Sequence, residues 1–218
     1  EDNTIFKEYQ RAGTLFFYLK GTYIYLGMNI FTTNDCPVIS AHEMCDKHVV
    51  KMIVEYAQLM STAHRVLDGK EYYDKTKAGR RIKRWLHPDK FLENNLYKAS
   101  HIKHPSGIWC RSTTGNYNWL YNHFIASCEE YTYRYGRTHL TFTKLADIFS
   151  THPKNLPDGP RQEFAVAIAA NQTCRQIPSF NSLKPVDKYK QYIINDKPFA
   201  VWTSRQPPSW FKNQAYHK

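Results

Sequence analysis

The chain has 218 residues, enough to bury a core without disulfide or metal staples, and its 30 lysines and arginines against 19 acidic residues give a formal charge of +11. Nucleic acid is the commonest partner of so basic a surface. Five cysteines without a CxxC pair argue against a disulfide framework, and no apolar run approaches the roughly 18 to 20 residues of a membrane span. We therefore expect a cytoplasmic, monomeric protein that binds DNA and makes no membrane contact.

Short strands are predicted near the N-terminus. Aromatic and β-branched residues in TLFFYL, TYIYL and MNIF favour strands around Gly21 and Gly27, where glycine permits turns. Met28 opens MNIF, which has the form of a protein start. We expect residues 1–27 to be an extension, either accessory or translated from upstream sequence, and residues 28–218 to form a single helical domain.

One long helix is predicted to follow the turn TTNDCP. From Val38 to about Arg65 the apolar residues recur at helical spacing, and Asp68 and Gly69 supply a C-terminal signal. One face of this helix carries Val49, Ile53, Tyr56, Met60 and Ala63.

The remaining elements complete a mainly α fold. Residues 70–90 are charge-dense and predict a solvated loop or short basic helix, with a merely soluble surface as the alternative. A second helix is expected to start near Gly115 and to end at Gly136, and shorter helices are expected from Phe142 to Phe149 and from Gln162 to Asn171. Residues 202–211, WTSRQPPSWF, predict an irregular aromatic segment. The expected architecture is one compact helical domain.

Acidic, basic and amine groups gather on the long helix. His48, Met52 and Glu55 fall at i, i+4 and i+7, on one stripe, and Lys51 lies beside it. A carboxylate among cations can act as a general acid or base, and a neighbouring amine as a nucleophile. The alternative is that His48 packs or caps while Glu55 pairs with Lys51 on a wet surface.

A loose cluster of potential metal ligands comprises Cys36, His42, Cys45 and His48. Its C-x8-C-x2-H spacing matches no common zinc pattern, so we expect neither a metal nor another cofactor. A metal-dependent nuclease that uses His42, Asp46 and His48 stays as a third functional hypothesis.

Two further segments combine basic and aromatic residues, as nucleic-acid surfaces do. They are EYTYRYGRTH, residues 130–139, and WTSRQPPSWFKNQAY, residues 202–216. His101 and His104, with lysines beside them, fit phosphate contact, although a proline-led turn is an alternative for that pair. Core aromatics with a polar fringe are the alternative for both longer segments.

Four strings carry a resemblance to known proteins: CDKHVVKMIVEYAQLMSTAHR (45–65), YKASHIKHPSGIW (97–109), EYTYRYGRTH (130–139) and RQPPSW (205–210). They resemble a widespread group of bacteriophage-encoded proteins, and the likeness covers nearly all of the chain from Met28 onward. More remotely, the layout is similar to the bacteriophage pyrimidine-dimer DNA glycosylases of the endonuclease V type.

The resemblance to these glycosylases implies a catalytic glutamate. In that family an Asp-x-His at the head of the first long helix precedes the glutamate by seven residues, as Asp46 and His48 precede Glu55. The family's nucleophile is its N-terminal amine, which would correspond to Asn29, or to Met28 if unprocessed. With residues 1–27 attached, that nitrogen is an amide and cannot form a Schiff base. The arginines that flank the family's glutamate are replaced here by Val54 and Gln58.

The leading hypothesis is a DNA glycosylase, with AP-lyase activity, that flips a damaged or modified nucleotide out of duplex DNA in the host-cell cytoplasm. Glu55 would move protons in a positively lined groove, a free amine at Asn29 or else Lys51 would attack the sugar, and His48 and Asp46 would orient the site. The alternative is a noncatalytic phage DNA-binding or host-takeover protein. The residues expected to contact DNA are Lys47, Arg65, His101, His104, Arg134, Arg137, Arg205, Trp210, Phe211 and Lys212.

Overall fold

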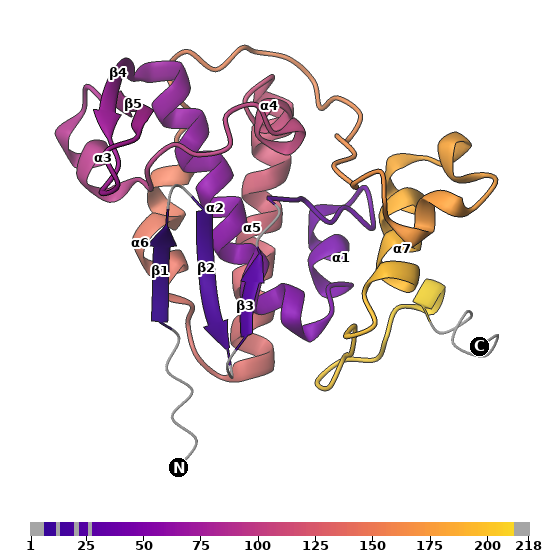
Figure 1. Ribbon diagram of the computed structural model, residues 1–218. Helices are drawn as coiled ribbons and strands as arrows, with labels where there is room; N and C mark the ends of the chain where they lie inside the picture. The colour runs from indigo at the N-terminus through magenta and orange to yellow at the C-terminus, as the bar shows by residue number, and fades with distance from the viewer. Residues whose placement is uncertain (1–6, 12–13, 20–21, 26–27, 212–218) are drawn as a thin grey trace.

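The computed structural model describes residues 7–11, 14–19, 22–25 and 28–211, with side chains from residue 28 onward, and it is mainly helical (Figure 1). Strands β1 (Lys7–Arg11), β2 (Thr14–Leu19) and β3 (Thr22–Tyr25) pair antiparallel in that order. Residues 28–31, in MNIF, form no strand, so that part of the strand prediction is wrong.

The predicted long helix is broken into two. Helix α1 covers Pro37–His42 and α2 covers Asp46–Asp68, with residues 43–45 between them. The backbone at the break bonds to a distant segment, since the Asp46 N–H donates to the Val201 carbonyl (2.9 Å) and the Trp202 indole N–H donates to the Glu43 carbonyl (3.1 Å). Long-range contacts therefore replace the intrahelical bonds that a continuous helix would make.

Helix α2 is the centre of the core. Every residue from 52 to 65 is buried, and the five apolar residues predicted for its inner face are all 0% exposed. Helix α5 (Thr114–Tyr135) packs against α1 and α2, and α6 (Leu140–Phe149) packs against α2 and α5. Both ends of α5 confirm the sequence prediction, because the Thr113 hydroxyl caps its first turn and Gly136 follows its last turn with a φ of 65°.

The charged stretch after α2 folds as a β-hairpin, so the predicted loop or short helix is wrong. Strands β4 (Lys70–Lys75) and β5 (Arg81–Leu86) pair antiparallel, and Gly79 takes a φ of 76° in the turn between them. Nearly all of the hairpin's side chains are exposed or half-buried. Short helices α3 (Lys90–Asn95) and α4 (Pro105–Cys110) connect it to α5.

The segment predicted as a helix from Gln162 to Asn171 is irregular, so that prediction is also wrong. Its backbone groups bond to other elements: the Glu163 carbonyl accepts from the Trp109 indole (2.8 Å), and the Ala167 N–H donates to the Tyr189 hydroxyl (3.0 Å). Tertiary partners thus satisfy groups that a helix would have paired internally.

The C-terminal region contains the 3-10 turns η1 (Thr173–Gln176) and η2 (Phe180–Ser182) and helix α7 (Pro185–Asp196). In Figure 1 α7 lies beside α1, on the side of the molecule away from the β4–β5 hairpin. Among the described residues, no helix combines the length and the apolar character that crossing a bilayer requires.

Candidate functional site

The structure brings Asn29 and Glu55 together. The backbone N–H of Asn29 donates to Oε2 of Glu55, at 3.2 Å, although the two residues are 26 positions apart in the chain. Asn29 is itself held by α7 and the irregular segment, since the Tyr189 hydroxyl donates to its Oδ1 (2.7 Å) and its Nδ2 donates to the Ala167 carbonyl (3.2 Å). The nitrogen that the resemblance nominated as nucleophile is therefore placed against the carboxylate that it nominated as acid–base.

Lys51 completes the polar group at Glu55. Its ammonium lies 3.4 Å from the other carboxylate oxygen, Oε1, one helical turn back on α2. That contact is an ion pair without the alignment of a hydrogen bond, because Oε1 has no hydrogen-bond partner among the described residues. The carboxylate thus has one amide donor and one cation, fewer partners than a buried carboxylate can accept.

Burial raises the pKa of Glu55 to about 7, and the charge of Lys51 and the Asn29 amide only partly offset that rise. The residue is 2% exposed. A carboxyl group with a pKa near 7 holds and releases a proton at neutral pH, which suits a general acid that afterwards acts as a base. The electrostatics of Glu55 therefore match an acid–base role.

The predicted positively lined groove at Glu55 is not present in this conformation, because the carboxylate is buried. The aromatic side chain of Phe31 stacks on Tyr192 of α7 (ring centroids 5.9 Å apart) and lies edge-on to Tyr189 (5.8 Å), so α7 packs against the segment whose Asn29 contacts Glu55. A sugar ring can reach Glu55 only if the elements packed around residues 29–31 move.

His48 behaves as a core aromatic residue. Its ring stacks on Phe31, with centroids 4.1 Å apart, and meets Phe199 edge-on at 5.7 Å. Burial lowers the pKa of His48 to about 3, with smaller contributions from Lys51 and Lys197. The imidazole is therefore neutral at physiological pH and supports Phe31 by packing, which corresponds to the packing alternative for this residue.

Asp46 has a structural role at the start of α2, which corrects the expectation that it orients the site. Its Oδ1 accepts from the Arg134 guanidinium (2.9 Å), and its Oδ2 accepts from the backbone N–H (2.9 Å) and the hydroxyl (2.8 Å) of Thr203. The carboxylate thus fastens α5 and the C-terminal segment to α2.

Two arginines expected to contact DNA are buried, and those predictions are wrong. Arg65 is 3% exposed and donates to the carbonyls of Tyr97, Trp85, Glu93 and Leu96 as well as to the Glu93 carboxylate. Arg134 is 9% exposed and pairs with Glu130 and Asp46. Neither guanidinium is free for a phosphate.

The other residues predicted to contact DNA are distributed over the surface. Lys47, His101 and Arg137 are exposed. His104 is half-buried and its Nδ1 caps α4 by accepting from the Ser106 N–H, and half-buried Arg205 pairs with Glu130. Lys212 lies outside the described residues.

Trp210 and Phe211 lie on the core rather than projecting from it. Phe211 packs on Trp202 (ring centroids 4.6 Å apart) and on Trp210 (6.1 Å), and all three side chains are at least half-buried. Both rings are therefore partly occupied by packing with other aromatic side chains, which limits the surface that could stack on a flipped base.

Sequence reasoning missed a cluster of His64, Asp68 and His87. His64 and Asp68 are four positions apart on α2, a spacing that puts two side chains on one helix face and could have indicated a site. His87 follows β5 and is brought to them only by the hairpin.

Comparisons of the chain with protein-family models, with curated proteins and with solved structures found no match.

Proposed function

We propose that the protein is a DNA glycosylase with strand-nicking lyase activity, acting on damaged or modified bases. The observation that carries the proposal is the 3.2 Å contact between the Asn29 nitrogen and Oε2 of Glu55. A carboxyl group with a pKa of about 7 beside that nitrogen supports it. This arrangement joins a proton donor and acceptor to a potential nucleophile at one point of the fold.

In the proposed reaction the α-amine of Asn29 attacks C1′ of a flipped nucleotide. A bond forms between nitrogen and C1′, the N-glycosidic bond breaks, and the base leaves with its bonding electrons and a proton supplied by the site. The C1′–O4′ bond of the sugar then breaks and O4′ takes a proton, while the amine loses its protons to Glu55 and solvent, which leaves a C1′=N Schiff base. A base then removes a proton from C2′, the C3′–O bond breaks, and the 3′ phosphate leaves. Flipping costs a few kcal/mol, which contacts to the extruded nucleotide must offset.

The proposal requires a free amine at residue 29, because the amide nitrogen of a longer chain cannot form a Schiff base. The active form is therefore one that begins at Asn29. It also requires movement of the elements around residues 29–31, since Glu55 is 2% exposed.

The test is borohydride trapping on duplex DNA that carries damaged or modified bases. A protein beginning at Asn29, made by a protease that leaves no extra residue, should form a covalent adduct, and the full chain should form none. Glu55→Gln in the shorter form should bind the DNA but cleave it at least about 100-fold more slowly, the order expected when an acid–base group is lost. No adduct from a folded protein that begins at Asn29 would defeat the lyase proposal.

A second candidate is a DNA-binding protein that breaks no bond, and the burial of Glu55 favours it. The exposed β4–β5 hairpin would serve as the contact surface: its basic residues are Lys70, Lys75, Lys77, Arg80, Arg81, Lys83 and Arg84. The Arg81 guanidinium also stacks on the Tyr73 ring at 3.5 Å. If this candidate is right, DNA affinity falls steeply with salt as phosphate contacts are screened, and Glu55→Gln leaves DNA affinity unchanged.

A further inference from the structure

A cavity of about 620 Å³ lies at the C-terminal end of α2, away from Glu55. Its wall includes His64 and Asp68 from α2, His87 from the end of the hairpin, and Asp147 and His152 from α6 and the segment after it. At 1.5 Å per helical residue, Glu55 and Asp68 are about 20 Å apart along α2, so this cavity is separate from the proposed catalytic site.

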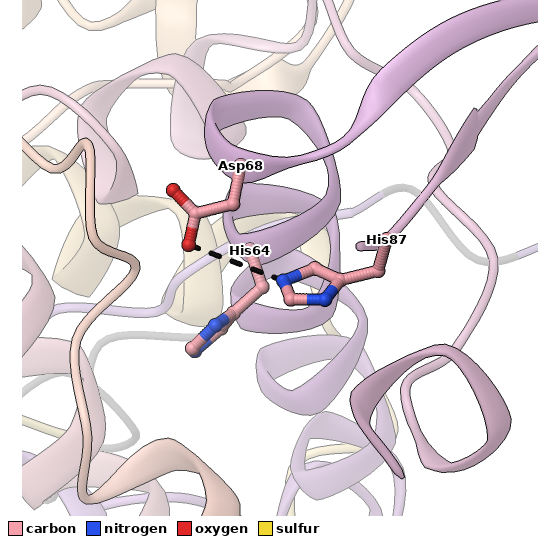
Figure 2. A group of neighbouring side chains, drawn as sticks. All are labelled: His64, Asp68 and His87. Atoms are coloured by element: carbon pink, nitrogen blue, oxygen red, sulfur yellow. Dashed lines mark ion pairs between the residues drawn. The ribbon is translucent and has the colours of Figure 1, made fainter. Parts of the chain in front are cut away.

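Three potential metal ligands converge on one side of this cavity. Figure 2 shows Asp68 and His64 projecting from neighbouring turns of α2, with the His87 ring reaching toward them from a separate segment. One ligand atom from each residue lies within 4.8 Å of the other two, and Nε2 of His87 is 3.9 Å from Oδ2 of Asp68.

Two buried nitrogens in this cluster have no hydrogen-bond partner among the described residues. They are Nδ1 of His64, which is 2% exposed, and Nε2 of His87, which is 5% exposed. An unpaired polar atom inside a protein is costly, and such atoms are normally satisfied by protein, water or an ion. The two nitrogens therefore point to a ligand that the protein itself does not supply.

We propose that His64, Asp68 and His87 bind a divalent transition-metal ion, with Zn²⁺ as the expected metal. Two imidazoles and one carboxylate form a ligand set that such ions take readily. All three residues line the cavity, and three protein ligands would leave a coordination position open, as in sites where a metal binds water or substrate.

The surroundings orient two of the ligands. Nε2 of His64 lies 2.9 Å from the Tyr117 hydroxyl, so this nitrogen can carry the proton and leave Nδ1 free for the metal. The Asp68 carboxylate is held by the backbone N–H groups of Lys154 (2.8 Å) and Asn155 (2.9 Å) and by the Asn155 amide (3.0 Å). These donors hold the carboxylate in place at the cavity wall.

Metal binding requires two local adjustments. Ligands bound to Zn²⁺ at about 2.0 to 2.2 Å in tetrahedral geometry are about 3.4 Å apart, so the side chains must close by under about 1.5 Å. Coordination through Nε2 of His87 also places the proton on Nδ1, which at present accepts from the Asp89 N–H at 3.1 Å. That hydrogen bond must open, and the Asp89 amide therefore reports on binding.

The test uses the full chain, stripped of metal with a chelator and titrated with ZnCl2 or CoCl2. We expect one ion per chain, a visible Co²⁺ spectrum of low coordination number, and NMR shifts at the His64 and His87 ring nitrogens and at the Asp89 amide. These readouts come from the unmutated protein, so the proposal stays testable even if a variant misfolds. No binding, or shifts confined to other histidines, would overturn it.

Variants then assign the ligands. His87→Gln and Asp68→Asn should each weaken Zn²⁺ binding by more than the 10- to 100-fold typical of outer-shell changes. His101→Gln, at an exposed histidine outside the cavity, is the matched control and should leave affinity unchanged. Equal affinity in wild type and a folded His87→Gln would refute the site. The titration involves no DNA, so its outcome is independent of the glycosylase proposal.

Discussion

Helix α2 carries two buried polar groups that differ in where their partners come from. At its middle, Glu55 receives the Asn29 N–H and the Lys51 ammonium. At its C-terminal end, His64 meets His87 from the segment after β5, beside a cavity of about 620 Å³ (Figure 2). Each of these histidines has a nitrogen without a hydrogen-bond partner among the described residues.

The difference shows two ways of managing buried polarity. The fold closes over Glu55 and compensates its charge only in part, through Lys51 and the Asn29 amide, so the pKa of the carboxyl group rises to about 7. His64 and His87 are also buried, but they line a cavity, and each has a nitrogen without a hydrogen-bond partner among the described residues. A substrate reaches Glu55 only if the surrounding elements move, whereas a metal ion at the histidines needs only local side-chain adjustments.

The largest expected effect is a loss of stability from a substitution beside the His64, Asp68 and His87 group. Arg65 directly follows His64 on α2 and holds the backbone of Trp85, Glu93 and Leu96 to the helix. Arg65→Met should lower the free energy of unfolding by about 3 to 5 kcal/mol, because buried acceptors and the Glu93 carboxylate lose their donor. Urea denaturation measures this loss.

Arg65→Met should also affect the two buried groups differently. Loosening the hairpin and α3 should also weaken Zn²⁺ binding, since His87 follows β5 directly, while the pH dependence due to Glu55 should persist in the remaining folded protein. The control is Arg137→Met at an exposed position, where we expect a loss below about 1 kcal/mol. Similar losses in the two variants would contradict the structural role of Arg65.

The second effect tests the closed state of Glu55 through pH. Because the pKa of Glu55 is raised to about 7 from its ordinary value of 4.5, the folded state holds a proton that the unfolded state releases, and stability falls as pH rises between these values. Glu55→Gln lacks that loss, so between pH 4.5 and pH 8 its stability should gain up to about 3 kcal/mol on the wild type.

Unfolding with urea at several pH values measures this gain. Exposed Glu163, changed to Gln, controls for the general effect of removing one negative charge. A constant difference between Glu55→Gln and wild type across this pH range would show that the carboxylate is open to solvent, and the contrast between the two groups would disappear.

The smallest effect concerns His48, which packs beside the Glu55 group. Its pKa is lowered to about 3, so its contribution to stability is present above pH 6.5 and is lost as pH falls toward 3. At pH 5 the loss should be about 2 kcal/mol relative to pH 8. His48→Phe keeps the stack on Phe31 and should remove this part of the loss.

Thermal or urea unfolding at pH 5 and 8 compares His48→Phe with the wild type. Some acid sensitivity should persist in the variant, because burial also lowers the pKa of His123 to about 4. If both proteins lose stability in parallel, His48 is not neutral and buried, and it returns as a candidate acid–base group.

Short-range patterns predicted the inner face of α2, the limits of α5 and most of α6, but not α3, α4 or α7. The inner face of α2 follows from apolar spacing, and the C-terminal end of α5 follows from Gly136. Predictions that ignored distant partners were wrong: α1 and α2 separate where Val201 and Trp202 bond to the backbone, and residues 162–171 bond to Trp109 and Tyr189 instead of to each other.

Positive charge by itself was not enough to predict DNA contacts. Arg65 and Arg134 were expected to bind DNA because they are cationic, yet each is buried among carbonyl groups and carboxylates of neighbouring elements. The sequence does not distinguish a guanidinium that meets solvent from one that fastens helices, because that depends on which acceptors the fold brings within reach.

The helical class and the buried stripe of α2 follow from the sequence, since periodicity and caps are encoded over a few residues, while the interest in Glu55 came from the resemblance. The contact of the Asn29 nitrogen with Glu55 and the meeting of His87 with His64 and Asp68 are visible only in the folded chain. These contacts join residues about 20 or more positions apart, and their formation depends on how the whole chain packs rather than on any local pattern.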